Sequence, residues 1–163
     1  MPKISGRIVL LLIVLATVGC DRVTKHVATT MLAGTPGRSY LADTVRLEYA
    51  RNTGGFLSLG ADWPPVVRTA FFTGATGLML LFVAIHAIRR DWDRWTGIGV
   101  TLFLAGGASN LIDRIVQGSV VDFLNLGIGP IRTGIFNVAD VALMLGGAMY
   151  LIGEFRHRRQ PTA

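Results

Sequence analysis

The stretch Val66–Ile88 constrains this chain most, because its 23 residues include one arginine, one histidine and no acidic residue. As a helix it would rise about 34 Å, enough to cross a hydrocarbon core about 30 Å thick. Thr96–Ile112 and Phe136–Ile152 are nearly as apolar. Small residues inside them, such as Gly106 and Gly146, are typical of helices that pack closely in lipid. The sequence therefore predicts a membrane protein.

The N-terminal apolar run is harder to interpret. Ile8–Gly19 has only 12 residues and leads into Cys20, as in the cleaved signal peptide of a bacterial lipoprotein. It spans a membrane only if the helix continues past Cys20 towards Val27. A soluble lipoprotein would not carry three further apolar stretches, so we expect an uncleaved first span, with Cys20 as a small packing residue. The prediction is a single domain, residues 1–163, with spans at about 8–27, 66–88, 96–112 and 136–152.

The charge distribution predicts the orientation of these spans. Charged residues make up only 16% of the chain, and its net charge of +6 comes largely from cations beside the apolar stretches, which favours a membrane protein over a nucleic-acid binder. By the positive-inside rule, both termini and the link at residues 89–95 are cytoplasmic. The links 27–65 and 113–135 then face outward. The cations concerned are Lys3, Arg7, Arg89, Arg90, Arg94, Arg156, Arg158 and Arg159.

The first outer link has the pattern of a small sheet. Thr44–Tyr49 alternates polar and apolar residues, Asn52–Gly55 has turn residues, and Phe56–Leu59 is a candidate returning strand. The predicted fold class is a membrane all-α protein, a four-transmembrane-helix bundle, with a small extracytoplasmic β platform at about residues 39–60.

Four acidic residues lie in or beside the apolar stretches, where ionisable groups are costly and mark functional sites. Asp113 is followed directly by Arg114, which favours a structural ion pair. Asp21 and Lys25 are four residues apart, so on a helix they share a face and can pair.

Asp122 and Asp140 differ because no cation is near them in sequence. Apolar surroundings raise the pKa of a carboxyl group, and two neighbouring carboxyl groups can share one proton. Such a pair can act as general base and general acid. The alternatives are an Asp122 in a turn or edge strand and an Asp140 that only stabilises a helix N-terminus.

Other chemistries fit less well. The sequence has no HExxH motif and no cluster of Cys and His, so neither a metal nor another cofactor is expected. A small transporter or proton-conducting protein remains an alternative, because buried acids also mark such paths. A path needs polar groups across the whole bilayer, however, and the inner halves of the second and fourth spans are almost purely apolar.

Five blocks together resemble one family, the lipoprotein signal peptidases (signal peptidase II). They occur in the family's order and cover most of residues 20–146. The blocks are Asp21-Arg22-Val23-Thr24-Lys25, Asn52-Thr53-Gly54-Gly55, Gly106–Arg114, Val120-Val121-Asp122-Phe123 and Phe136-Asn137-Val138-Ala139-Asp140.

The resemblance implies a bacterial inner-membrane aspartic endopeptidase that uses no metal. It would cut prolipoprotein signal peptides on the amino side of a diacylglyceryl-modified cysteine, among membrane lipids, and would be blocked by globomycin-type cyclic peptides. We expect a monomer. The catalytic pair maps onto Asp122 and Asp140. The supporting positions are Asp21, Lys25, Asn52, Gly107, Asn110, Asp113, Arg114, Asn137 and Ala139. The chain departs from the family pattern at Arg22, where Gln is common, and at Gly55-Phe56-Leu57, where Ala-Ala-Phe is common.

Overall fold

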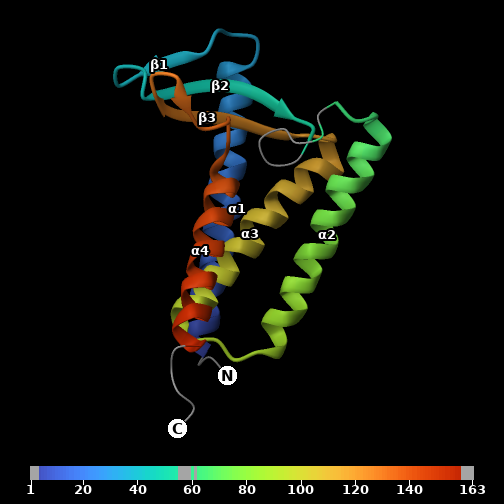
Figure 1. The fold of residues 1–163 in the computed structure, drawn as a ribbon, viewed down its shortest axis with the longest axis vertical. Coiled ribbons are helices and arrows are strands. Elements are labelled where there is room, and N and C mark those ends of the chain that lie inside the picture. Colours follow the sequence, from blue (N-terminus) through green and yellow to red (C-terminus); the bar gives the residue numbers. More distant parts are fainter. Residues whose placement is uncertain (1–3, 55–59, 61, 159–163) are drawn as a thin grey trace.

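A computed structural model describes residues 4–54, 60 and 62–158. This part of the chain forms a helical bundle with a small sheet across one end (Figure 1). The helices are α1 (Ile4–Leu32), α2 (Pro65–Arg89), α3 (Arg94–Gln117) and α4 (Val138–Arg158). The strands are β1 (Arg38–Tyr40), β2 (Val45–Asn52), β3 (Val120–Ile128) and β4 (Ile131–Arg132).

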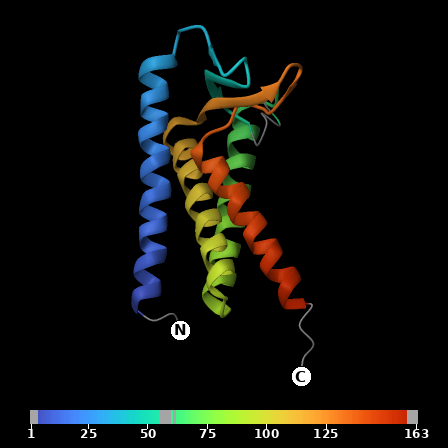
Figure 2. The same cartoon turned by 90° about the vertical axis from the view of Figure 1, so that its left-hand side faces the viewer.

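Three helices of the described part, α2, α3 and α4, are long and apolar enough to cross a membrane. The sequence required the first helix to continue past Cys20 towards Val27 if it was to span a membrane. Helix α1 does so, because it continues without a break to Leu32. Its 29 residues rise about 44 Å. In the pictures α1 is the helix that reaches beyond the sheet, while its start and the end of α4 lie at the opposite end of the bundle (Figures 1 and 2).

Helix ends differ from the predicted spans in two informative places. Asp93 caps α3 by accepting hydrogen bonds from the backbone N–H groups of Trp95 and Thr96. The helix then runs past the predicted end at Ile112 to Gln117 and is capped by Gly118, whose φ of 67° is left-handed. Charged residues in its last turns therefore do not end the helix. Helix α4 begins at Val138, two residues after the predicted start of that span.

The small residues let the helices approach one another closely. A Cβ added to Gly146 of α4 would lie 2.5 Å from the carbonyl oxygen of Gly99 on α3. One added to Gly107 would collide with Leu80 of α2. These contacts confirm close packing at two predicted positions, whereas a Cβ on Gly74 would meet nothing within 4 Å.

The sheet is antiparallel, with the strand order β1-β2-β3-β4. A platform at this end of the bundle was predicted, but half of it comes from residues 120–132, which the sequence left as a connecting link. A cluster of Ala28, Leu32 and Val121, with Leu47, Tyr49 and Phe123 packed against it, fixes the sheet to α1. The predicted returning strand at Phe56–Leu59 lies outside the described residues.

Candidate active site

Asp122 lies on β3 and is 2% exposed. Its Oδ1 accepts a hydrogen bond from Asn137 Nδ2 at 2.6 Å, and its Oδ2 accepts one from Asn52 Nδ2 at 3.0 Å. Burial raises the pKa of the Asp122 carboxyl to about 6, with a smaller contribution from the charge of Asp140, although both amide hydrogen bonds act in the opposite direction. Asp122 is therefore a carboxyl group that can hold or release a proton near neutral pH.

Asp140 is the third residue of α4 and lies in the helix's first turn. Its Oδ2 accepts from the backbone N–H of Asn137, and its own N–H donates to Asn137 Oδ1 at 2.9 Å. This reciprocal arrangement is a capping box. The cap that the sequence offered as an alternative is therefore present, and it fixes the carboxyl group of Asp140 beside the amide that contacts Asp122.

Asn110 on α3 links Asp140 to a lysine. Its Nδ2 donates to Asp140 Oδ1 at 2.8 Å, and its Oδ1 accepts from Lys25 Nζ at 2.8 Å. An ammonium group can only donate hydrogen bonds, so Lys25 requires the oxygen of the Asn110 amide on its side. The NH₂ group of Asn110 must then face Asp140, which fixes the direction of the hydrogen bond.

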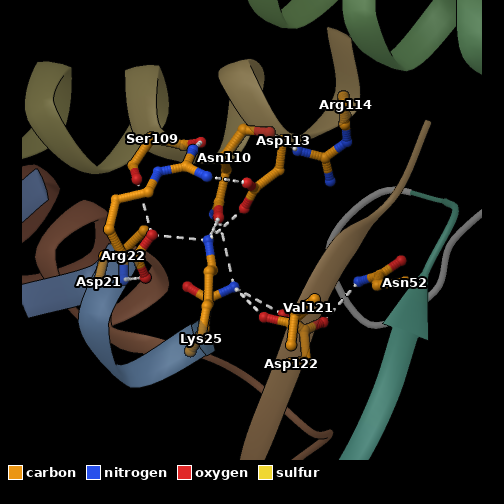
Figure 3. Close-up of polar contacts among 12 residues, drawn as sticks. Asp21, Arg22, Lys25, Asn52, Ser109, Asn110, Asp113, Arg114, Val121 and Asp122 are labelled. Atoms are coloured by element: carbon orange, nitrogen blue, oxygen red, sulfur yellow. Dashed lines mark hydrogen bonds and ion pairs between the residues drawn. The ribbon is translucent and has the colours of Figure 1, made fainter. Parts of the chain in front are cut away.

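Behind this amide lies an ion-pair cluster, which we define as Asp21, Arg22, Lys25 and Asp113 (Figure 3). Lys25 Nζ is 2.7 Å from a carboxylate oxygen of Asp21, the predicted pair, and 2.7 Å from Asp113 Oδ2. Arg22 Nη1 is 2.5 Å from Asp113 Oδ1. All three donor hydrogens of Lys25 therefore have acceptors, because Asn110 takes the third.

The ion pair of Asp113 was predicted correctly, but its partner was not: Arg114 was expected. Asp113 pairs with α1, while Arg114 donates from Nη2 to the carbonyl oxygen of Gly54 at 3.0 Å. Adjacent helical residues point about 100° apart and do not face each other, so the sequence neighbour is a poor partner. The structural character expected for Asp113 agrees with its burial among cations.

Asp21 connects three helices. Its Oδ1 accepts from the backbone N–H of Ala139, at the start of α4, and its Oδ2 accepts from Ser109 Oγ at 2.7 Å. A carboxylate at a helix N-terminus also meets the positive end of the helix dipole. Sequence reasoning missed Ser109 and treated Arg22 only as a departure, although Arg22 also donates to the Ser109 carbonyl oxygen. Ser109 lies 88 residues from Asp21 and 87 from Arg22, so no local spacing pointed to these contacts.

Asp122 and Asp140 both line a cavity of about 210 Å³. Apolar side chains of α2 and α4, including Phe72, Met79 and Leu143, form part of its wall. The predicted residues on the wall are Asn52, Gly107, Asn110, Arg114, Asp122 and Asp140, and those behind it are Asp21, Lys25, Asp113, Asn137 and Ala139. The structure therefore brings every predicted site residue into one region; the departure at Gly55-Phe56-Leu57 lies outside the described residues.

Arg114, which the family resemblance placed among the supporting residues, also lines this cavity. It lines the wall beside both acids, although it is eight residues from Asp122 in sequence. Its Nε is buried and has no hydrogen-bond partner within the described part of the chain. Among the described residues, the cavity thus combines two carboxyl groups that accept hydrogen bonds from amides with a guanidinium whose Nε–H has no acceptor.

Comparisons with known proteins agree with this site. Residues 13–156 match the family described as signal peptidase (SPase) II. A lipoprotein signal peptidase from Streptococcus pneumoniae is 33% identical over 92% of this chain and 94% of its own length. One from Vibrio parahaemolyticus is 30% identical over 91% of this chain and 86% of its own.

Solved structures of bacterial membrane enzymes have the same fold. A bacterial membrane enzyme solved at 2.3 Å resolution superposes with a TM-score of 0.80 and 26% identity, over 95% of this chain and 93% of the other. The match covers the bundle and the sheet together, and the sequence relatives share the name that the motifs suggested. The chain belongs to the signal peptidase II family.

Proposed function

We propose that the chain is an aspartic endopeptidase that removes the signal peptide of prolipoproteins on the amino side of a diacylglyceryl-modified cysteine. Cleavage of prolipoprotein signal peptides follows from the family, and a transporter is not favoured. The aspartic mechanism is supported by one observation: Asp122 and Asp140 face a single cavity, and the hydrogen bonds that reach both come from amide groups.

In this mechanism the two carboxyl groups share one proton. The ionised one accepts a proton from water, which attacks the scissile carbonyl, and the protonated one donates to the leaving amine. Asn137 contacts both acids and so keeps their separation fixed. Arg114 directs its Nε–H, which has no acceptor among the described residues, to a carbonyl oxygen of the substrate, where negative charge develops during attack.

We further propose that α1 is a fourth span and that the described chain is one membrane domain. An uninterrupted helix of 29 residues supports this topology, and its charged residues at 21, 22 and 25 are turned into the bundle or its edge. With the cations inside, both termini face the cytoplasm, and the sheet and the cavity lie at the outer face of the bacterial inner membrane.

This placement of the cavity determines how the substrate reaches it. A signal helix and its lipid chains enter sideways from the bilayer, which the apolar cavity wall of α2 and α4 permits. Cyclic peptides of the globomycin type are expected to block the cavity, and the enzyme is expected to act as a monomer.

The test uses the full chain in phospholipid vesicles with a diacylated prolipoprotein and its unlipidated counterpart. Mass spectrometry should show that the lipidated substrate alone is cut, with the modified cysteine at the new N-terminus. The Asp140→Asn variant, with the same melting temperature as the wild type, should leave the substrate intact. Equal cleavage by this variant, or cleavage at another bond, would contradict the proposal.

A further inference from the structure

A second cavity of about 250 Å³ lies between α2, α3 and α4, in the half of the bundle away from the sheet. Most of its wall is apolar: Phe82 and Val83 come from α2, Val100 and Phe103 from α3, and Gly147 from α4. Phe82 is 72% exposed, so this inner cavity opens to the side of the bundle. Its residues are not among those proposed for catalysis.

The same face of each helix lines both the inner cavity and the cavity of Asp122 and Asp140. Along all three helices the lining residues follow one another in steps of three and four, the spacing that keeps side chains on one helix face. The two cavities are therefore consecutive parts of one groove, which we call the interhelical groove. The series are Thr76, Met79, Val83 and His86 on α2, Asn110, Gly107, Phe103 and Val100 on α3, and Asp140, Leu143, Gly147 and Tyr150 on α4.

The interhelical groove is narrow where the two cavities adjoin. There Leu80 of α2 packs on α3, because a Cβ added to Gly107 would lie 2.4 Å from Leu80 Cδ2. Further from the sheet α2 diverges from α3, towards the end of the bundle that holds the chain termini (Figure 1). A helix with its side chains is about 10 Å across, too wide to lie between helices that touch at this point. A single hydrocarbon chain is narrower and fits along the groove.

Aromatic side chains close the inner end of the groove. The ring of Trp92, in the link between α2 and α3, has its centroid 5.5 Å from that of His86 and 5.7 Å from that of Tyr150. The indole N–H donates to the Ala87 carbonyl oxygen at 3.0 Å, and the Arg90 guanidinium lies 4.8 Å from the ring centroid. Trp and Tyr with a neighbouring cation are typical of the boundary between hydrocarbon and headgroups. The groove therefore ends at the boundary opposite the sheet.

The length of the groove suits an acyl chain that starts beside the two acids. Along α3 it extends from Arg114 to Val100, a rise of about 21 Å at 1.5 Å per residue. One leaflet of acyl chains fills half of a hydrocarbon core about 30 Å thick. A chain attached to a cysteine held at Asp122 and Asp140 is thus long enough to bring its last methylene groups into the inner cavity, and too short to pass the aromatic end.

We propose that an acyl chain of the substrate's diacylglyceryl group lies in the interhelical groove and ends in the inner cavity, which places the adjoining peptide bond beside Asp122 and Asp140. This inference rests on the proposed function, because it takes the lipid-modified prolipoprotein as substrate. Bilayer chains are as apolar as the groove, so transfer between them changes the free energy little. The groove acts by orienting the substrate, and chains too short to reach the inner cavity orient it less well.

Photo-cross-linking locates the chain. A prolipoprotein with a diazirine at the end of its acyl chains is irradiated with the full-length Asp140→Asn variant in phospholipid vesicles. Mass spectrometry should find cross-links at inner-cavity residues such as Val83, Phe103 or Tyr150. Cross-links only at bilayer-facing positions such as Leu78, which is 70% exposed, would overturn the proposal. Stronger labelling of the inner cavity from a diazirine in the signal helix would also overturn it, because the peptide would then occupy the groove.

Two helical glycines give a matched pair of variants. A Cβ on Gly147 would meet Phe103 at 3.8 Å, an ordinary contact inside the inner cavity, and one on Gly74 would meet nothing within 4 Å. Gly147→Leu therefore fills the cavity, and Gly74→Leu is the control on α2 outside the groove. Melting temperatures close to that of the wild type show that both variants are folded.

The readout is the ratio of cleavage rates for a dipalmitoyl and a didecanoyl form of one prolipoprotein at the same subsaturating concentration. The wild type and Gly74→Leu should favour the dipalmitoyl form several-fold, and Gly147→Leu should bring the ratio close to one. The same ratio in all three proteins would overturn the proposal. Failure of the wild type to cleave either form would contradict the proposed function instead.

Discussion

The ion-pair cluster and the pair Asp122–Asp140 occupy one end of the same bundle, yet they hold their carboxyl groups by different means. In the cluster, Asp21 and Asp113 each meet the ammonium group of Lys25. The two acids on the cavity receive hydrogen bonds from the amides of Asn52, Asn110 and Asn137. The two groups therefore differ in the partners that compensate their burial: cations in the cluster, and neutral amide donors at the cavity.

Removing the cation at the centre of the cluster should have the largest effect on stability. Lys25→Met leaves Asp21 without its cation and Asp113 with Arg22 alone, and breaking a buried pair in this way costs about 3–5 kcal/mol in free energy of unfolding. Thermal unfolding of the purified protein, followed by tryptophan fluorescence, measures this change. Arg46→Met, which breaks the exposed pair with Asp43, is the control and should leave the melting temperature nearly unchanged. Similar decreases in melting temperature for Lys25→Met and Arg46→Met would show that the buried cluster is no more important for stability than the exposed pair.

The pH dependence of stability should reveal the raised pKa of Asp122. Between about pH 4 and 6, Asp122 is already ionised in the unfolded chain but still protonated in the folded one, whose pKa is about 6. The folded state then binds more protons, so the free energy of unfolding falls as the pH rises, by about 3 kcal/mol over this range.

Asp122→Asn removes this titration and supplies the reference. The melting temperature of the wild type, relative to that of the variant, should fall between pH 4 and pH 6 and level off above. Parallel curves for the two proteins would show that Asp122 has an ordinary pKa.

Ser109→Ala should have an intermediate effect. The Ser109 hydroxyl donates at 2.7 Å to the buried carboxylate of Asp21, and hydrogen bonds to charged groups contribute about 1.5–3 kcal/mol. Ser39 donates to Asp43 at the same distance on the exposed sheet, so Ser39→Ala is a matched control with a smaller expected loss. Equal changes in unfolding free energy for Ser109→Ala and Ser39→Ala would mean that the buried hydrogen bond to Asp21 stabilises the protein no more than the exposed one to Asp43.

The smallest effect is expected at Arg22, whose side chain is 36% exposed. Arg22→Gln introduces the residue common in the family and removes one of the two cations on Asp113. Because Lys25 remains, the expected loss is about 1 kcal/mol or less, with cleavage of prolipoprotein retained. A loss as large as that of Lys25→Met would show that Arg22 is the main partner of Asp113.

The sequence predicted local features better than contacts between distant segments. Helix α2 was placed to within one residue, and the Asp21–Lys25 pair followed from helical spacing. Apart from the edge strand considered as an alternative for Asp122, β3 was not predicted, because its sequence lacks a clear polar and apolar alternation: Val120, Val121 and Asp122 are all buried, on both faces of the sheet.

In the candidate active site, too, contacts between distant segments were harder to predict than local features. Its acids and amides were identified from motif blocks, but the partner of Asp113 was not, because helical neighbours diverge while α1 and α3 meet across about ninety residues of sequence. The residues alone paired Arg114 with Asp113, whereas the family resemblance placed it among the supporting residues, and in the folded chain it lines the cavity of Asp122 and Asp140.

The contrast between the two groups of acids is tested most directly by the cleavage rate of a diacylated prolipoprotein, normalised to folded enzyme, in three single variants. Asp122→Asn and Asp140→Asn should each lose about 10²–10⁴-fold in rate while remaining folded. Asp113→Asn should lower the melting temperature, yet its folded fraction should still cleave. Full activity in either of the first two, or a stably folded but inactive Asp113→Asn, would contradict the account and, in the latter case, place Asp113 in the catalytic pair.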